Sequence, residues 1–167
     1  MKRCIGLVCL VIFCFCSVSC EKAPAMSELL VYEGEARTYA LRIRDGDTYA
    51  VTLGTGEGRE AFTFSEGELA ELSVCFDADG VSLSYRAMKF PITSPVLLRA
   101  THWRELFRLG EKNLLWQIRR ETLGGIAVYE CRADGVILYL DAGSRLPLKI
   151  TSGEVEIDVL SCEETAE

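Results

Sequence analysis

Apolar and polar residues alternate with a period of two along most of the chain after residue 35. Tyr39, Leu41 and Ile43 form one such run, and Asp45-Gly46 separates it from the next. A period of two places successive side chains on opposite faces of a sheet, and Asp-Gly favours a tight turn between strands. The same pattern recurs at 49–53, 62–64, 72–76, 81–85, 114–118, 126–131, 136–140, 148–150 and 155–159. It predicts an antiparallel meander.

One segment breaks this alternation and has the spacing of a helix. Ser94 followed by Pro95 favours a helix start, and apolar residues then recur at helical intervals. We expect Gly110 to end this helix in a left-handed conformation. The fold class is therefore expected to be mainly β (α+β), with a single curved antiparallel sheet or half-barrel of about 8–11 strands. One helix near 94–109 is expected to cover the sheet.

The N-terminus has the pattern of a secretory signal. Lys2 and Arg3 precede an uncharged run from Cys4 to Ser19, which is shorter than the roughly 20 apolar residues needed to span a bilayer. Two interpretations of Cys20 stay open: an ordinary cleavage site precedes it, or its thiol is the point of lipid attachment. The segment Ser17-Val18-Ser19-Cys20 resembles a bacterial lipoprotein lipobox, although Ser replaces the usual Leu at its first position. This resemblance favours lipid attachment at Cys20.

Composition and charge limit the possible partners. The 167 residues include 18 Lys plus Arg and 25 Asp plus Glu, and a net charge of −7 argues against a general nucleic-acid binder. An apolar fraction of 49% is enough for a core. We expect an extracytoplasmic protein that is anchored to a bacterial membrane by a lipidated Cys20. The predicted parts are a signal peptide (1–19), a lipidated N-terminus and tether (20–34), a half-barrel-like β domain (35–162) and an acidic tail (163–167). Within the second part, a short helix or the first strand is expected near Ser27 to Tyr32.

Three cysteines follow Cys20 in the sequence, which are Cys75, Cys131 and Cys162. Cys75 and Cys131 each lead into an Ala-Asp-Gly-Val turn, so they are the pair expected if any disulfide forms. The alternative is that all three are unpaired apolar fillers. There is no CxxC pair among them, so we expect no metal or redox centre.

Candidate catalytic motifs are few. His102 is the only histidine, and it lies three residues before Glu105 in the predicted helix, which is more typical of a partly exposed helical residue than of a catalytic base. The run 54–58 is GxGxG and is followed by a strand-like segment, so it indicates a hairpin loop. The segment 77–80 lacks the further ligands of a calcium loop and indicates a turn. We expect no catalytic residue, metal or cofactor, and no enzyme activity.

Three segments carry a family resemblance within the strand-rich order of 35–160. They are Leu69-Ala-Glu-Leu-Ser-Val-Cys-Phe-Asp77, Leu83-Ser-Tyr-Arg-Ala-Met-Lys-Phe90 and Tyr139-Leu-Asp-Ala-Gly-Ser-Arg-Leu-Pro-Leu-Lys-Ile150. On these the chain resembles the outer-membrane lipoprotein carrier (LolA/LolB-like) superfamily and related small lipoproteins of Gram-positive bacteria. The resemblance implies a half-barrel closed by helices over an apolar cavity that holds acyl chains. This chain departs from it by having little helix before the first hairpin.

The large apolar side chains allow either a filled core or a ligand cavity between sheet and helix. Three classes of function follow: an apolar-ligand binder, an envelope interaction or structural lipoprotein with a filled core and a protein partner, and an enzyme. No convergent polar cluster supports an enzyme. We expect a binder of an acyl chain or lipidated molecule. The expected ligand-binding residues are Phe76, Phe90, Trp103, Phe107 and Trp116.

Overall fold

The computed structural model describes residues 23–86, 88–90 and 95–165. It does not describe the side chains of residues 89, 90, 95 and 96. The predicted signal peptide, Cys20, the predicted N-cap Ser94 and the last two residues of the predicted acidic tail lie outside the described residues.

Two helices and eleven strands make up the described part of the chain. The helices are α2 (Met26–Leu29) and α3 (Pro95–Phe107), with single 3₁₀ turns at Gly67–Leu69 and Leu109–Glu111. The strands before α3 are β1 (Arg37–Asp45), β2 (Asp47–Gly56), β3 (Arg59–Phe64), β4 (Leu72–Asp77), β5 (Gly80–Tyr85) and β6 (Met88–Phe90). The strands after α3 are β7 (Gln117–Leu123), β8 (Ile126–Ala133), β9 (Val136–Asp141), β10 (Pro147–Ser152) and β11 (Val155–Glu164).

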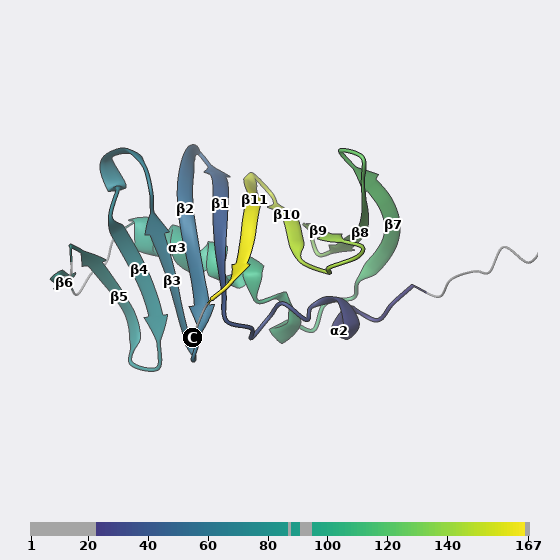
Figure 1. The fold of residues 1–167 in the computed structure, drawn as a ribbon, viewed down its shortest axis with the longest axis horizontal. Helices are drawn as coiled ribbons and strands as arrows, with labels where there is room; N and C mark the ends of the chain where they lie inside the picture. The colour runs from purple at the N-terminus through teal and green to yellow at the C-terminus, as the bar shows by residue number, and fades with distance from the viewer. Residues whose placement is uncertain (1–22, 87, 91–94, 166–167) are drawn as a thin grey trace, which may run out of the picture.

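All eleven strands belong to one antiparallel sheet with the order β6-β5-β4-β3-β2-β1-β11-β10-β9-β8-β7. Two meanders, β1–β6 and β7–β11, are joined where β11 pairs with β1. The first and last strands therefore lie at the centre, and β6 and β7 form the two edges. Figure 1 shows α3 crossing behind the first meander, while the second meander curls away from it. The predicted fold class, a single curved antiparallel sheet with one covering helix, is confirmed.

Side-chain alternation decides which face of the sheet α3 covers. On β1, Tyr39, Leu41 and Ile43 are all buried, and Arg42 and Arg44 point to the opposite face. Removal of apolar surface from water is favourable and does not depend on direction, so α3 packs on the face of the sheet that carries the apolar side chains.

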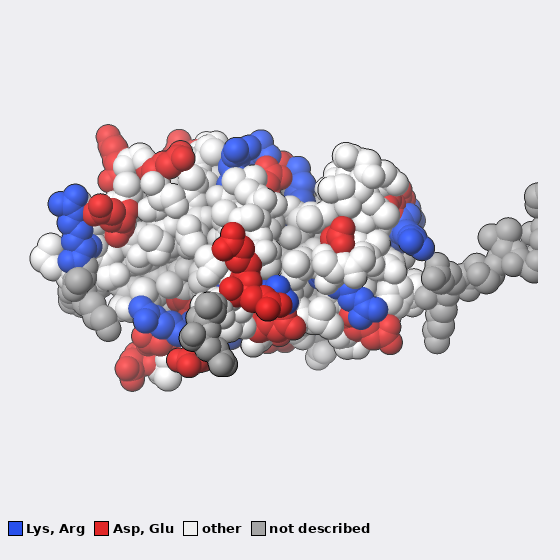
Figure 2. All heavy atoms as spheres, in the orientation of Figure 1, with Lys and Arg blue, Asp and Glu red and all other residues white. Residues whose placement is uncertain are grey.

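The opposite, outer face of the sheet has two kinds of surface. Over the middle of β2–β5 the outward positions hold small uncharged residues, namely Ala50, Thr52, Gly54, Ala61, Thr63, Ser73, Cys75, Ser82 and Ser84. The outward positions of β1, β11 and β10 include a group of charged residues, in which Arg44 and Lys149 each form salt bridges with both Glu156 and Asp158. Figure 2 shows the uncharged area over β2–β4, with acidic and basic side chains gathered elsewhere on this face.

The space between α3 and the first meander is filled by aromatic side chains. Trp103 is 0% exposed and packs against Tyr49, Phe62 and Phe64, with ring centroids 5.4–6.3 Å apart. Its indole Nε1 donates a hydrogen bond to Asp45 Oδ2 over 2.9 Å, which satisfies the buried N–H. Under α3 the core is therefore a packed interior.

The segment before β1 also contributes to the core. Leu29 in α2 and Tyr32 just after it are 0% and 3% exposed, and both belong to the hydrophobic core cluster. Arg145 holds α2 in place by donating a hydrogen bond to the Glu28 carbonyl over 2.8 Å. Part of the segment assigned from sequence to the tether is thus a buried element of the domain.

One expectation from the sequence is wrong, and of the two alternatives for the cysteines the unpaired one holds. Gly110 does not have a positive φ: α3 ends at Phe107, and Gly110 lies in the following 3₁₀ turn. A Cβ at this position would lie 2.6 Å from Glu33 Oε2, so a larger residue requires the Glu33 carboxylate to shift. Cys75 and Cys131 cannot pair, because β4 and β8 are in different meanders and the two side chains lie on opposite faces of the sheet. Cys75, Cys131 and Cys162 are all free thiols.

Candidate functional site

The structure describes the side chains of four of the five predicted ligand-binding residues, and it does not bring these four together. Phe76 is buried on β4, where its ring contacts Phe62 and lies under the Arg104 guanidinium. Trp103 is enclosed in the core beneath α3. Phe90 belongs to β6, and its side chain lies outside the described residues. Neither Phe76 nor Trp103 lines one of the two hollows described below.

The other two predicted residues line two neighbouring hollows. Trp116 is half-buried in the segment that leads from α3 to β7, and Phe107 is the last residue of α3. The hollow at Trp116 has a volume of about 610 Å³, and the hollow at Phe107 about 350 Å³. Both volumes fall in the range of about 300–1,000 Å³ that is usual for small-molecule sites.

We call the first hollow the Trp116 groove. One wall is α2 with the residue after it, and the other is the chain from Leu109 to Trp116. Its lining residues are Met26, Ser27, Leu30, Glu33, Leu109, Gly110, Lys112, Asn113, Leu114, Leu115 and Trp116. Six of them are apolar, and Leu115 is 93% exposed, the highest value among the exposed large apolar side chains of the described chain. The groove therefore places the exposed Leu115 side chain beside a surface that also carries the polar side chains of Ser27, Glu33, Lys112 and Asn113.

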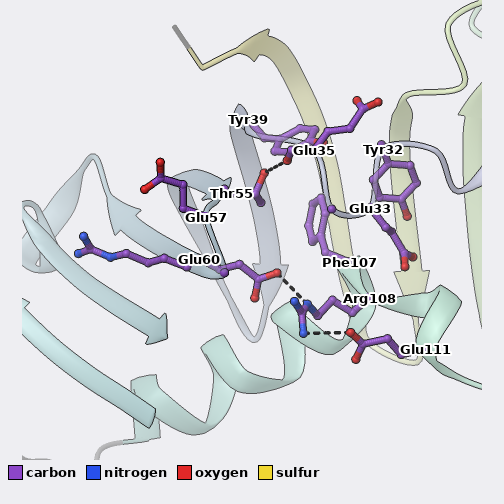
Figure 3. Close-up of a pocket in the computed structure, with 14 residues that line it drawn as sticks. Tyr32, Glu33, Glu35, Tyr39, Thr55, Glu57, Glu60, Phe107, Arg108 and Glu111 are labelled. Carbon is purple, nitrogen blue, oxygen red and sulfur yellow. Dashed lines mark hydrogen bonds and ion pairs between the residues drawn. The ribbon is translucent and has the colours of Figure 1, made fainter. Parts of the chain in front are cut away.

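We call the second hollow the tyrosine cleft. It lies between the residues before β1, the β2–β3 hairpin and the end of α3, as Figure 3 shows. Its aromatic residues are Tyr32, Tyr39 and Phe107, and its charged residues are Glu33, Glu35, Glu57, Arg59, Glu60, Arg108 and Glu111. The Tyr39 and Phe107 rings are tilted at 52° to each other with centroids 5.7 Å apart. The cleft thus combines aromatic faces with an excess of carboxylates.

Ion pairs account for part of that charge. Glu60 forms salt bridges with Arg104 and Arg108, and Arg108 also pairs with Glu111 at 3.0 Å. These contacts fasten the end of α3 to β3.

Glu33 lies between the two hollows and lines both. Its carboxylate accepts hydrogen bonds from the Gly110 N–H over 2.9 and 3.1 Å. Burial raises the pKa of Glu33, while the backbone N–H groups of Gly110 and Leu109 act in the opposite direction. This contact ties the segment before β1 to the turn after α3.

Burial also perturbs the tyrosines and one thiol near the cleft. Desolvation raises the pKa of Tyr32 well above its ordinary value, and the nearby Glu33 carboxylate adds to the effect. The pKa of Tyr39 is also raised, chiefly by burial and then by Cys162. Burial raises the pKa of Cys131 to about 12. All three groups therefore stay protonated at neutral pH.

Sequence analysis missed Tyr32, Tyr39 and Glu33 as residues of a site. Tyr39 fits the alternation of β1 so well that its pattern indicates only a core position. Tyr32 and Glu33 lie in the segment assigned to a tether, and nothing local marks them as neighbours of residues 107–111. The Gly-rich run 54–58 is the one visible signal, and it forms the hairpin that overhangs the tyrosine cleft.

The remaining candidate motifs line neither of the two hollows. His102 is exposed on α3, and the segment Asp77–Gly80 forms a turn in which the Asp79 N–H donates to Asp77 Oδ1 over 3.0 Å. Among the described residues there is no group of three or more His, Cys, Asp and Glu side chains that could hold a metal ion. Nor does any helix in this part of the chain have the length and apolar character to cross a membrane.

Comparison with known proteins identifies a related fold but no family. No protein-family model matches the sequence, and no curated protein matches it. An uncharacterized conserved protein from Thermus thermophilus superimposes with a TM-score of 0.56 at 10% identity, over 84% of this chain and 85% of that chain. This likeness shows that the two chains share a fold.

A LolA superfamily protein, NE2245 from Nitrosomonas europaea, superimposes with a TM-score of 0.42 at 11% identity. The match covers 87% of this chain and 96% of that chain. The superposition is too loose to assign a family, so the superfamily stays a resemblance.

Proposed function

We propose that the chain is a membrane-anchored extracytoplasmic lipoprotein whose β domain binds an apolar ligand, such as an acyl chain or a lipidated molecule. The ligand lies in the Trp116 groove. The observation that carries this proposal is the apolar lining of the groove on both walls, with Leu115 left 93% exposed at its mouth. Burial of apolar surface at about 25 cal/mol per Å² supplies the driving force. Glu33 and Lys112, the charged residues of the groove, orient a polar head group.

The position of the groove agrees with the proposed anchor. Met26 in the groove wall is six residues after Cys20, so the chain between them spans at most about 20 Å. A lipid on Cys20 would thus keep the groove close to the membrane, where apolar ligands are found. We propose no catalytic role, because neither hollow contains the paired nucleophile and base that acyl transfer or hydrolysis requires.

Ligand binding can be tested with a fluorescent fatty-acid probe. The probe should bind the wild-type chain saturably, and Trp116→Ala and Leu115→Asp should each weaken it at least five-fold. Leu98→Asp is the matched control, since Leu98 is 74% exposed on α3 and lies outside the groove. The proposal fails if Leu115→Asp and Leu98→Asp leave the same affinity. Replacing Cys20 with Ala tests the anchor separately, and it should abolish metabolic lipid labelling.

A second function is favoured by the filled interior beneath α3. Because Trp103 is fully enclosed, a ligand cannot enter there unless α3 moves away from the sheet. The alternative function is that of an envelope lipoprotein with a filled core and a protein partner. In that case the Trp116 groove would be the surface that contacts the partner. Photocrosslinking from position 115 distinguishes the two, because a lipid ligand yields no crosslinked protein and a partner yields one discrete adduct.

A further inference from the structure

A third hollow, which we call the arginine hollow, lies where the described chain begins. One wall holds Ala23, Pro24 and Glu28, and the other holds Ile118–Arg120 of β7 with Tyr129 of β8. Its volume is about 410 Å³, and it shares no residue with the Trp116 groove or the tyrosine cleft. Figure 1 shows the start of the described chain passing the start of β7. The hollow is therefore a separate candidate site.

The arginine hollow lies at an edge of the sheet, because β7 is the last strand in the sheet order. Arg120 is opposite Tyr129 in the register, and Arg119 is opposite Glu130, so the two arginine side chains start from opposite faces of the sheet. Both are exposed, and both line the hollow. The hollow thus extends along the edge of β7, with a guanidinium group from each face.

The charges at this hollow are the reverse of those in the whole chain. Acidic residues outnumber basic ones by 25 to 18 in the sequence, whereas the hollow is lined by two arginines and one glutamate. Arg145 adds a third guanidinium group beside Glu28, whose carbonyl accepts its hydrogen bond over 2.8 Å. The carboxylate of Glu130, across from Arg119, already accepts two hydrogen bonds from Arg132. An anion is therefore the charge that the hollow favours.

The rest of the lining indicates what carries that anion. A planar guanidinium group donates two parallel hydrogen bonds to a phosphate or a carboxylate. Pro24, Ile118 and Tyr129 are half-buried in the same hollow, and they offer apolar contact to the carbon atoms next to the anion. The lining thus fits an amphiphile with an anionic head group.

The position of the hollow favours a lipid of the surrounding membrane. Ala23 is three residues after Cys20, so the chain between the hollow and the proposed anchor spans at most about 10 Å. Basic side chains held this close to a membrane surface are attracted to anionic head groups. We therefore propose that the arginine hollow binds the phosphate head group of an anionic phospholipid. The choice of a membrane lipid rests on the proposed anchor, whereas the anion site rests on the hollow alone.

The test compares two lipids with the same acyl chains, dihexanoylphosphatidylglycerol and dihexanoylphosphatidylcholine, as monomers at low salt. Each is titrated into the full chain by calorimetry, and the ratio of the two affinities isolates the head group. The anionic lipid should bind at least ten-fold more tightly. Arg119→Gln and Arg120→Gln should each lower this ratio at least three-fold, and Arg119→Lys should lower it less, because it keeps the charge and loses only the planar fork.

Arg42→Gln is the matched control, because Arg42 is an exposed arginine on β1 that lines none of the three hollows. It should leave the ratio unchanged. Trp116→Ala should also leave the ratio unchanged, so a failure of the groove and a failure of the arginine hollow can be distinguished. Urea unfolding of each variant ensures that a lower ratio is not the result of unfolding.

Four results overturn the proposal. Equal affinity for the two lipids would mean that the head group is not recognised. Equal losses in Arg42→Gln and in the two hollow variants would mean that only net charge matters. Inorganic phosphate that binds as tightly as the anionic lipid would make the ligand a free anion. Binding of a polyglutamate peptide in preference to the lipid would assign the hollow to an acidic protein.

Discussion

Leu29 lies in the segment that the sequence predicts to be a tether, but its side chain is buried in the core. It lies in a four-residue helix whose N-cap residue, Ala25, makes no side-chain hydrogen bond, so α2 has little intrinsic stability. Yet Leu29 is 0% exposed and belongs to the core cluster of the whole domain. If α2 is held by tertiary contacts alone, truncating this side chain should have the effect of a core substitution.

The magnitude follows from the burial. Leu29→Ala removes a fully buried isobutyl group and leaves a cavity, so we expect the free energy of unfolding to fall by about 2.7–5 kcal/mol. Val31→Ala is the matched control, because Val31 is 42% exposed two residues later, and its cost should stay within about 0.5 kcal/mol. Urea unfolding monitored by tryptophan fluorescence measures both values.

A smaller loss for Leu29→Ala can have a specific cause. The segment from α2 to β1 could detach locally while the sheet stays folded. The measured loss of stability could then not exceed the free energy needed to detach this segment. Hydrogen exchange separates the cases, since local detachment removes protection from the Leu30 amide, which donates to the Met26 carbonyl, and leaves β1 protected. Equal costs for Leu29→Ala and Val31→Ala, with unchanged exchange, would refute the assignment of α2 to the core.

Three further predictions rest on single contacts. Gly110→Ala should lower the free energy of unfolding by about 1–2 kcal/mol, measured with urea, because the new Cβ meets the Glu33 carboxylate. Gly54→Ala is the control and should lower it by less than ~1 kcal/mol, because nothing lies within 4 Å of a Cβ there. Equal losses in the two variants would contradict the close approach at Gly110. Hydrogen bonds from Ser144 and Gly143 lower the pKa of Asp141 in the folded protein. The ionised carboxylate therefore stabilises the fold above the ordinary pKa of an aspartate, and this stabilisation is lost as the pH falls through the lowered pKa. Asp141→Ala should therefore lower the free energy of unfolding by about 1 kcal/mol at pH 7 and by less in acid. A loss of stability that does not change with pH would contradict this role of Asp141. Native-state alkylation near pH 8 should label Cys162 before Cys131, whose pKa is raised to about 12, and simultaneous labelling is the opposing result.

The β architecture can be predicted from the amino-acid sequence alone. Alternation in β1, such as buried Tyr39 and Leu41 beside outward Arg42, follows from local geometry, because a strand of period two has one face that must be covered. The Asp45-Gly46 turn and the helix that begins at Pro95 are also local signals, and both elements form where the pattern predicts them. The pairing of β1 with β11 carries no comparable local signal, since it joins residues more than 110 positions apart.

The positions of the hollows and the residues that line them depend on tertiary packing and could not be predicted from the sequence. Trp103 and Phe107 have the same helical spacing in the sequence, but the packing of α3 encloses Trp103 completely and leaves Phe107 at the wall of the tyrosine cleft. Likewise, nothing near Tyr32 or Glu33 indicates that both will meet the end of α3, some 75 residues later. Periodicity reports which side of an element is buried, and a cleft depends on how far apart the elements are and how their side chains fill the gap. That depends on contacts between segments distant in sequence, which a local pattern does not contain.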